Sequence, residues 1–483
     1  MPREVDVVVI GAGPVGENVA DRARAAGLEV VIVERELVGG ECSYWACVPS
    51  KTLLRSAAAL RAAQRVPGAA EAVTGELDVA AVFRRRNAFV SDWSDQGGAD
   101  WLDSVGIGLE RGQGRLDGPR RVVVEHADGS RTTLVAKHAV AVATGSDAAM
   151  PAIDGLADAR PWTSREATSA QEAPARLAVI GGGTVAVEMA TAFAGFGSEV
   201  TVLARSGLLS AQEPFAGEAV AEGLRELGAT VRLHTSPERV ERNDDGATVI
   251  TLPDGETIEA DEVLVATGRT PRTRDLGLET VGLEPGEWIE VDDTLLVTGT
   301  RAGDGDGDWL YAVGDVTRRA LLTHQGKYQA RAAGDVIAAR ALGRPVDNAP
   351  WGVHVATADH AAVPSIVYSE PEVASVGLTE AAAREAGLAV RVVEVGLDAV
   401  SGTGIHSDGP AGRAKLVLDA DRDVVVGATF VGQDVGELLQ AATIAIVGEV
   451  PVRRLWHAVP AFPSVSEIWL RLLETLGRPE ADA

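Results

Sequence analysis

The segment VDVVVIGAGPVG, residues 5–16, decides the fold of this chain of 483 residues. Its first six residues are apolar except for Asp6, a pattern typical of a strand buried in a parallel sheet. They lead into a Gly-x-Gly-x-x-Gly turn and an alanine-rich segment that predicts a helix to about Ala26. A second strand, predicted over 29–33, ends at Glu34. Strand, glycine turn, helix, strand and acidic residue, in this order, are the fingerprint of a dinucleotide-binding unit.

The fingerprint gives its glycines and its acidic residue distinct roles. The glycines permit a tight turn and let a pyrophosphate approach the N-terminus of the helix. Glu34 is placed to bind the ribose hydroxyls. The three glycines are Gly11, Gly13 and Gly16.

A second copy of the same unit lies in the middle of the chain. Its strand is predicted over 177–180, its helix runs through Gly195, and its second strand covers 200–203. Two such units in one chain imply two bound nucleotides. The turn of the second copy carries Gly181, Gly183 and, in the third position, Ala186.

The tripeptide Ala-Thr-Gly occurs twice, at 143–145 and 266–268, each time after an apolar strand. We interpret both copies as strand ends where the chain passes close to a bound dinucleotide. Thr144, Gly145 and Gly268 are therefore candidate cofactor contacts. An ordinary tight turn is the alternative, and it suits either copy alone better than both together.

Cys42 and Cys47 are the only two cysteines of the chain, and they directly follow the first dinucleotide unit. A chain of this length does not need a disulfide for stability, so a pair in one short loop suggests a redox-active disulfide. The alternative is two buried thiols that act as small apolar side chains. Tyr44 and Trp45, between them, either shape a substrate pocket or pack the start of a helix.

The spacing of the two cysteines restricts the local structure. Residues five apart on one helix are separated by about 7.5 Å along its axis, whereas a disulfide requires Cα atoms about 4.4–6.8 Å apart. We therefore expect Cys42 just before a helix and Cys47 in its first turns, with the helix continuing over 50–63. The helix N-terminus would favour a thiolate there.

Composition narrows the class of protein. The net charge of −26 argues against binding to nucleic acid or to anionic membrane surfaces. No apolar run approaches the roughly 18 residues of a membrane span, and no signal segment stands at the N-terminus, so we predict a cytoplasmic protein. The Gly-Asp repeat at 303–308 lacks the ligand spacing and final glutamate of a calcium loop, which predicts a solvated loop and no metal site. From about Trp351, short strands mixed with helices predict an α+β domain.

The order of these motifs resembles the pyridine nucleotide-disulfide oxidoreductases. The resemblance rests on both fingerprints, on Cys-x4-Cys-Val-Pro-Ser-Lys at 42–51, on both Ala-Thr-Gly segments and on Ala-Val-Gly-Asp at 312–315. The segment 363–374 resembles the start of their dimerisation domain. Dihydrolipoamide dehydrogenase and mercuric reductase are the branches that the chain resembles most.

The resemblance implies an α/β fold with two Rossmann-like dinucleotide-binding domains and a C-terminal α+β dimerisation domain. The implied FAD-binding domain is formed by 1–150 and, as its second or central part, 271–350; 151–270 bind NAD(P) and 351–483 form the dimerisation domain. The implied assembly is a homodimer with FAD in each subunit and a nicotinamide nucleotide that delivers hydride to the flavin.

Individual roles follow from the same resemblance. Cys47 would contact the flavin and Cys42 would attack the substrate, while Lys51 would pair with Glu188 beside the reactive flavin nitrogen. The implied FAD contacts are Gly11, Gly13, Gly16, Glu34, Gly40, Lys51, Gly114, Thr144, Gly145, Asp315, Leu322 and Thr323, with His324 following near the flavin ring. The implied contacts of the nicotinamide nucleotide are Gly181, Gly183, Ala186, Arg205 and Gly268.

The C-terminal segment departs from the family pattern, His-Pro-Thr-x-x-Glu. Glu467 remains in place, but Phe462 stands where the family has the histidine that acts as acid and base across the dimer. General acid-base catalysis contributes about 10²–10⁴-fold, so efficient reduction of a bulky disulfide is doubtful unless His457 substitutes. Mercuric reductases also lack this histidine but carry an extra C-terminal cysteine pair, whereas this chain has no cysteine beyond Cys47. Soluble transhydrogenases have an aromatic residue there but generally lack one of the two redox cysteines.

The second strand of the second unit favours NADPH. An NADH site usually ends this strand with an acid, but here Ala204-Arg205-Ser206 follows. Arg205 can pair with a 2′-phosphate. The alternative is a surface arginine with no such role and NAD as the cofactor.

Three functions remain open from the sequence. The first passes electrons from NADPH through FAD to Cys42 and Cys47 and on to an unidentified disulfide or thiol-reactive small molecule. The second is an NAD(P)H:quinone or dye reductase that acts at the flavin, for which Phe462 would provide an apolar access channel. The third is a redox-sensing protein with little turnover, against which Lys51, Glu188 and the two intact fingerprints argue.

Overall fold

A computed structural model describes residues 2–300 and 308–478. The Gly-Asp repeat predicted to be a solvated loop without metal therefore lies, except for its last residue, outside the described residues. The contacts between Cα atoms divide the chain into two compact units, each of which draws on three segments. The first unit contains Met1–Pro49, Asn87–Ala148 and Arg269–Asp359; the second contains Ser50–Arg86, Ala149–Gly268 and His360–Ala483.

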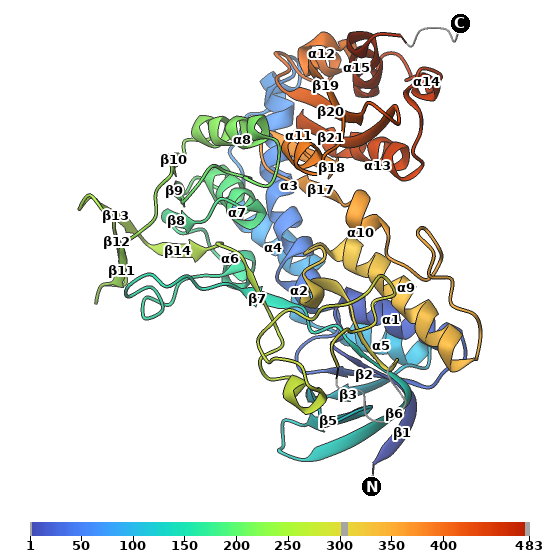
Figure 1. Cartoon of the computed structure of the whole chain (residues 1–483). Helices are drawn as coiled ribbons and strands as arrows, with labels where there is room; N and C mark the ends of the chain where they lie inside the picture. The colour runs from blue at the N-terminus through green and yellow to red at the C-terminus, as the bar shows by residue number, and fades with distance from the viewer. Residues whose placement is uncertain (1, 301–307, 479–483) are drawn as a thin grey trace, which may run out of the picture. The chain divides into compact units, whose positions relative to one another are not determined.

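The first unit is built on a seven-stranded sheet of described residues, in the order β3-β2-β1-β6-β5-β4 with β16 beside β6 (Figure 1). The pairs β3-β2, β2-β1, β1-β6 and β6-β16 are parallel, and β6-β5-β4 is antiparallel. The strands are β1 (Arg3–Ile10), β2 (Val30–Glu34), β3 (Gly108–Arg111), β4 (Gln113–Leu116), β5 (Arg121–Glu125), β6 (Arg131–Val142) and β16 (Leu310–Ala312). A separate antiparallel pair joins β7 (Ser146–Ala148) to β15 (Arg269–Pro271).

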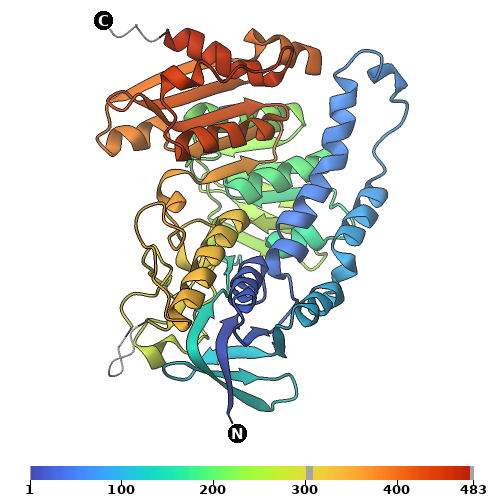
Figure 2. The same cartoon turned by 90° about the vertical axis from the view of Figure 1, so that its right-hand side faces the viewer.

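Successive apolar side chains of β1 alternate between the two faces of the sheet, so each face carries a buried core. Val7 and Val9 pack toward the helices, where buried alanines let α1 and α9 approach each other closely (Figure 2). Val8 and Ile10 belong to a second buried cluster on the opposite face. The helices of the unit are α1 (Pro14–Ala25), α2 (Gly40–Tyr44), α5 (Gln96–Ser104) and α9 (Thr323–Ala341).

The second unit repeats the parallel arrangement in a four-stranded sheet ordered β10-β9-β8-β14. The strands are β8 (Arg176–Ile180), β9 (Glu199–Ala204), β10 (Thr230–Leu233) and β14 (Glu262–Val265). Beside it, β11 (Arg239–Arg242), β12 (Thr248–Thr251) and β13 (Thr257–Ala260) form an antiparallel sheet. The helices are α6 (Ser164–Ser169), α7 (Thr184–Gly195) and α8 (Pro214–Glu226), while α3 (Cys47–Gln64) and α4 (Val79–Phe89) each place most of their length in this unit.

The C-terminal part of the second unit is a five-stranded antiparallel sheet, β17-β18-β21-β20-β19, as the α+β prediction required (Figure 2). Leu416 and Phe430 on one face pack against α13 and α15, and Val417 on the other face packs toward α11. The strands are β17 (Pro364–Val367), β18 (Glu372–Gly377), β19 (Val390–Gly396), β20 (Arg413–Asp419) and β21 (Val424–Gly432). The helices are α11 (Glu380–Glu385), α12 (Ser401–His406), α13 (Leu439–Val447), α14 (Val452–Leu455) and α15 (Ile468–Leu476), while α10 (Ala358–Ala361) is divided between the two units after Asp359.

One local prediction was wrong. Cys42 does not lie in the loop before a helix but inside the short helix α2, and α3 begins at Cys47 as expected. Gly39 and Gly40 have φ values of 111° and 55°, so the chain turns there and enters one helical turn. That turn ends at Trp45, where φ is −137°. The cysteines therefore lie on two helices separated by a kink rather than on one continuous helix.

The division into four domain segments remains a prediction. The two units differ from it by grouping both 50–86 and 360–483 with the second dinucleotide unit. Among the helices in the described part of the chain, none has the length and apolar character needed to cross a membrane.

Candidate active site

The first glycine turn is shaped for close approach of a ligand. Gly11 has a φ of 104°, and a Cβ atom on it would lie 2.4 Å from the carbonyl oxygen of Ala143. A Cβ atom on Gly16 would lie 1.9 Å from the carbonyl oxygen of Gly11, so only glycine lets the helix pack against the turn. Gly40 approaches Gly13 in the same way, since a Cβ atom on Gly40 would lie 2.8 Å from the Cα atom of Gly13. The crowded backbones explain why the sequence needs glycine at each position.

A cavity of about 470 Å³ opens above this turn, entirely within the first unit. Its lining contains ten of the residues that the sequence pointed to: Gly11, Gly13, Glu34, Gly40, Cys42, Gly114, Thr144, Gly145, Asp315 and Thr323. Gly16, Leu322, Cys47 and Lys51 are not among the lining residues. Bare glycine backbones with a carboxylate on either side fit the pyrophosphate and polyol parts of FAD.

Hydrogen bonds fix both carboxylates of the cavity. Glu34 accepts the backbone N–H groups of Ala12 and Glu36, both at 2.7 Å. Asp315 accepts the hydroxyl of Ser146 at 2.6 Å, and that hydroxyl in turn accepts Nε of Arg269 at 2.9 Å. Both acids therefore hold their orientation before any ligand binds, which lowers the entropy cost of binding.

Glu17, in the first turn of α1, was not singled out from the sequence. Burial raises the pKa of Glu17 to about 7; Lys327 opposes this rise and Glu34 adds to it. A carboxyl group that is partly neutral near pH 7 places less negative charge beside a pyrophosphate site. Its position directly after the glycine turn is the sequence feature that could have identified Glu17 as a residue near the cofactor site.

The two cysteines lie at the edge of this cavity. Cys42 lines the cavity from α2, and both cysteines are half-buried. Cys47 is the first residue of α3, and its Sγ atom lies 3.3 Å from Oγ1 of Thr323, which lines the cavity. A sulfur at a helix N-terminus with a hydroxyl neighbour is in a position that favours the thiolate.

The aromatic residues between the cysteines differ in their surroundings. Tyr44 is 7% exposed, its hydroxyl donates to the carbonyl oxygen of Ser94, and its own carbonyl accepts the indole N–H of Trp93. Tyr44 therefore packs against the segment 93–94, which fits the alternative that this aromatic residue has a packing role at the start of a helix. Trp45 is half-buried with its ring centroid 5.7 Å from that of Tyr44.

The predicted pair of Lys51 and Glu188 is formed within the second unit. Nζ of Lys51 lies 2.7 Å from Oε2 of Glu188, and the other carboxylate oxygen accepts the backbone N–H of Tyr368 at 3.1 Å. The Lys51 ammonium also lies 5.2 Å from the ring centre of Tyr368. Glu188 is 3% exposed, so these two contacts offset the cost of burying its side chain. Sequence reasoning missed Tyr368 because it stands 180 residues from Glu188.

The second glycine turn reproduces the first. Gly181 has a φ of 138°, and its Cβ atom would lie 2.3 Å from the carbonyl oxygen of Ala266, which opens the second Ala-Thr-Gly segment. Gly268 has a φ of 149°, and Ala186 is fully buried on α7. Gly183 has open space where its side chain would be. Both Ala-Thr-Gly segments thus lie against a glycine turn, which a tight turn alone does not explain.

Arg205 is exposed directly after β9, at the carboxyl end of the parallel sheet. The neighbouring strand β10 ends at Leu233, which is paired with Ala204, so the exposed His234 follows at the same edge. The N–H of Thr235 donates to the carbonyl oxygen of Ala204 at 2.9 Å and holds the two segments together. His234 is a second candidate contact that the sequence analysis missed, because β10 was not predicted.

The C-terminal segment keeps its acid without the histidine. Glu467 is 5% exposed, and its Oε2 atom has no hydrogen-bond partner among the described residues. Phe462 is 76% exposed, and His457 is also exposed.

Residues 5–334 match the family model described as pyridine nucleotide-disulphide oxidoreductase, and residues 363–472 match the dimerisation domain of that family. The chain belongs to the pyridine nucleotide-disulphide oxidoreductases. It is 32% identical to a mercuric reductase of Staphylococcus aureus over 96% of this chain and 81% of the relative. Identity is 35% to a mercuric reductase of Streptomyces lividans over 94% and 92%, and 33% to a dihydrolipoyl dehydrogenase of Thermus scotoductus over 98% and 97%.

Solved structures share the fold of this pyridine nucleotide-disulphide oxidoreductase. The HOCl-induced flavoprotein disulfide reductase RclA from Escherichia coli superposes with a TM-score of 0.80 at 24% identity, over 97% of this chain and 99% of that one. LpdA from Mycobacterium tuberculosis gives a TM-score of 0.81 at 24% identity, over 98% and 100%.

The family and fold class predicted from the sequence are thereby confirmed. The protein is an NAD(P)H-dependent oxidoreductase of the pyridine nucleotide-disulphide family, for which binding of FAD and of a pyridine nucleotide is expected.

Proposed function

We propose that this oxidoreductase transfers two electrons from NADPH to the Cys42–Cys47 disulfide and from there to a disulfide or thiol-reactive small molecule. The balanced overall reaction consumes NADPH, a proton and one acceptor disulfide and yields NADP⁺ and two thiols. FAD, when bound, supplies the two-electron carrier between the nucleotide and the protein disulfide. The observation that carries the proposal is the position of Cys42 in the lining of the cavity formed by the first fingerprint.

The protein's own residues have separate tasks in this proposal. Gly11, Glu34 and Asp315 hold FAD. Cys47 keeps its sulfur as a thiolate, which the start of α3 and the hydroxyl of Thr323 favour. Cys42, on the neighbouring helical turn, is the sulfur that attacks the acceptor.

An anaerobic titration of the purified flavoprotein with NADPH tests this function. The unaltered protein is expected to take up four electrons per FAD, two of them by the disulfide. The Cys42→Ser variant is expected to take up only two electrons per FAD. Uptake of two electrons by the unaltered protein would remove the cysteines from the reaction. Ser43→Ala, on the same short helix, is the matched control and should still take up four.

We also propose NADPH rather than NADH as the donor. Arg205 and His234 are exposed and directly follow the paired strands β9 and β10 at one edge of the sheet, and no acid follows β9 to bind a 2′-hydroxyl. Both can meet a 2′-phosphate bound at this edge. Loss of a charge-assisted hydrogen bond costs about 1.5–3 kcal/mol, so Arg205→Gln should lower the ratio of kcat/KM for NADPH to that for NADH at least about tenfold. Arg225→Gln, an exposed arginine on α8, should leave the ratio unchanged. A preference for NADH in the unaltered enzyme would refute the assignment.

The acceptor is narrowed by the C-terminal segment. Because Phe462 cannot transfer a proton, turnover of lipoamide or glutathione disulfide is expected to be slow. Reduction of mercuric ion, the activity named for several relatives, would have to proceed without a C-terminal cysteine pair, since the sequence has none. A small acceptor whose leaving thiol needs little acid catalysis fits best.

A second candidate is an NAD(P)H:quinone or dye reductase that acts at the flavin. It is favoured by Phe462, which is 76% exposed and offers an apolar surface to an aromatic acceptor. Under this alternative Cys42→Ser retains quinone turnover, whereas the first proposal predicts loss of the physiological activity in that variant.

We further propose a homodimer and the four-segment domain division: 1–150 with 271–350, 151–270, and 351–483. The matched dimerisation domain carries exposed apolar side chains, including Ile444 and Val459, at 59% and 84% exposure. Such side chains are typical of a surface that a partner covers. Sedimentation equilibrium should give twice the mass of one chain; a monomer at micromolar concentration would contradict the assembly.

A further inference from the structure

A buried glutamine connects the Gly314–Asp315 turn to a carboxylate far along the chain. Gln329 lies on α9 and is fully buried. Its Oε1 atom accepts the backbone N–H of Gly314 at 2.8 Å, and its Nε2 atom donates to Oδ2 of Asp359 at 3.0 Å. All of these residues belong to the first unit.

Only one orientation of the Gln329 amide satisfies both partners. A backbone N–H can only donate, and an ionised carboxylate can only accept. The amide oxygen must therefore face Gly314, and the amide nitrogen must face Asp359. The Asp359 carboxylate thereby sets the direction of the acceptor that holds the turn.

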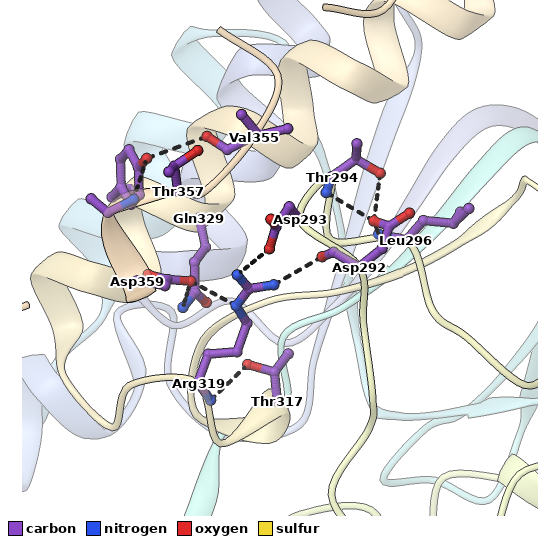
Figure 3. Close-up of polar contacts among 12 residues, drawn as sticks. Asp292, Asp293, Thr294, Leu296, Thr317, Arg319, Gln329, Val355, Thr357 and Asp359 are labelled. Carbon is purple, nitrogen blue, oxygen red and sulfur yellow. Dashed lines mark hydrogen bonds and ion pairs between the residues drawn. The ribbon is translucent and has the colours of Figure 1, made fainter. Parts of the chain in front are cut away.

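Asp359 is itself held in place from several sides, as Figure 3 shows. Its side chain is 1% exposed and forms an ion pair with Nε of Arg319 at 2.9 Å. Arg319 also donates to Oδ1 of Asp293 at 2.6 Å. Gln325, one helical turn before Gln329, donates to the other oxygen of Asp359 at 2.7 Å. The orientation of Gln329 thus rests on a carboxylate that cannot easily move.

We call the hydrogen-bonded chain from Asp359 through Gln329 to Gly314 the relay. The turn at its Gly314 end carries a residue that lines the cavity. Gly314 has a φ of 76°, its N–H is held by Gln329, and its carbonyl oxygen accepts the hydroxyl of Thr317 at 2.9 Å. Asp315 follows directly and lines the cavity. Because both backbone groups of Gly314 are bonded, the direction of the next residue is determined by these bonds.

We propose that Gln329 and Asp359 are positioning residues for the FAD site: Asp359 orients the Gln329 amide, which fixes the Gly314 turn and so aims Asp315 into the cavity. This inference rests on the proposed role of Asp315 in holding FAD. Neither residue lines the cavity. Their effect on FAD is therefore exerted through the turn.

Charge exchange along the relay provides the test. In Gln329→Glu the new carboxylate still accepts the Gly314 N–H, but it faces Asp359 with a like charge. Adding Asp359→Asn supplies an amide whose nitrogen donates to the new carboxylate and whose oxygen still accepts from Gln325. The double variant therefore restores a donor and an acceptor between positions 329 and 359, while Arg319 loses the oxygen that it shared with Gln329 and keeps Asp293 as its carboxylate partner. FAD is titrated into apoprotein of each variant, and the dissociation constant is read from flavin fluorescence, at neutral pH.

We expect FAD to bind about tenfold more weakly to Gln329→Glu and to recover to within about threefold in the double variant. Gln325→Met is the matched control, since Gln325 is equally buried and bonds Asp359 but does not touch Gly314. It should leave the FAD dissociation constant unchanged even where it lowers Tm. A purely structural network would instead weaken FAD binding equally in both glutamine variants.

Two results would overturn the inference. One is a double variant that binds FAD no better than Gln329→Glu alone, and the other is unchanged FAD binding in Gln329→Glu. If Gln329→Glu yields no folded apoprotein, the double variant with Asp359→Asn is tested instead. A folded double variant that binds FAD supports the inference, and a double variant that also fails to fold overturns it. Asp315→Ala separates this inference from the proposed function. If Asp315→Ala leaves FAD binding unchanged, the proposed role of Asp315 in holding FAD is wrong. If Asp315→Ala weakens FAD binding but Gln329→Glu does not, only the positioning role of Gln329 and Asp359 is rejected.

Discussion

Replacing Lys51 with methionine should destabilise this oxidoreductase more than replacing its partner Glu188 with glutamine. The two side chains are 2.7 Å apart, but their exposures differ: 3% for Glu188 and 35% for Lys51. In Lys51→Met the buried carboxylate keeps only the backbone N–H of Tyr368 as a partner. In Glu188→Gln the amide oxygen can still accept that N–H, and the Lys51 ammonium can turn toward water.

The magnitude follows from this asymmetry. Removing one partner of a fully buried ion pair costs about 3–5 kcal/mol, because a buried charge is left without a counterion. Lys51 is about one-third exposed, so water can partly replace it, and we reduce the cost of Lys51→Met to about 2 kcal/mol. Glu188→Gln should cost about 1 kcal/mol, the value of one hydrogen bond. The double variant buries no charge and should be more stable than Lys51→Met.

Equilibrium unfolding in urea, followed by far-UV circular dichroism on the FAD-loaded protein, measures these differences. Lys137→Met is the matched control, since its ammonium bonds Asp6 at 3.2 Å on the surface, where Lys137 is 48% exposed. Its cost should stay below about 0.5 kcal/mol. Equal losses for Lys51→Met and Glu188→Gln, or a double variant less stable than both, would refute the reasoning.

Three further predictions concern other parts of the molecule. Burial raises the pKa of Glu372 to about 7 from 4.5. Between these pH values the folded protein holds a proton that the unfolded chain releases, so the free energy of unfolding falls as pH rises from 4.5 through 7. Glu372→Gln should remove up to about 3 kcal/mol of this fall, measured by urea unfolding at several pH values, and an unchanged pH profile would contradict the prediction. Gly11→Ala should abolish FAD binding because its Cβ atom would lie 2.4 Å from a carbonyl oxygen, whereas Gly75→Ala, with open space around it, should keep the flavin-to-protein absorbance ratio of the unaltered protein. Thr323→Val removes the hydroxyl 3.3 Å from Sγ of Cys47 and should slow alkylation of the reduced protein by iodoacetamide about tenfold; an unaltered rate would show that this hydroxyl does not support the thiolate.

The sequence determined the features that depend on near neighbours in the chain. The turn at Gly11 and its copy at Gly181 were predictable because a backbone this crowded admits only glycine, and the flanking apolar runs predict buried parallel strands. The start of α3 at Cys47 was equally local. The separate helix α2 was not, because it depends on the φ values of Gly39 and Gly40, which the spacing of the cysteines does not reveal.

Tertiary structure alone decided which distant residues share a site. Tyr368 meets Glu188, and Asp359 meets Gln329, only because the folded sheets and helices bring them within hydrogen-bonding distance. His234 and Arg205 follow the same edge of the sheet because β10 pairs in parallel with β9, a register that no local pattern marks. The physical reason is the same in each case: a polar group buried on folding must find a partner, and the partner is set by packing between elements rather than by position in the chain.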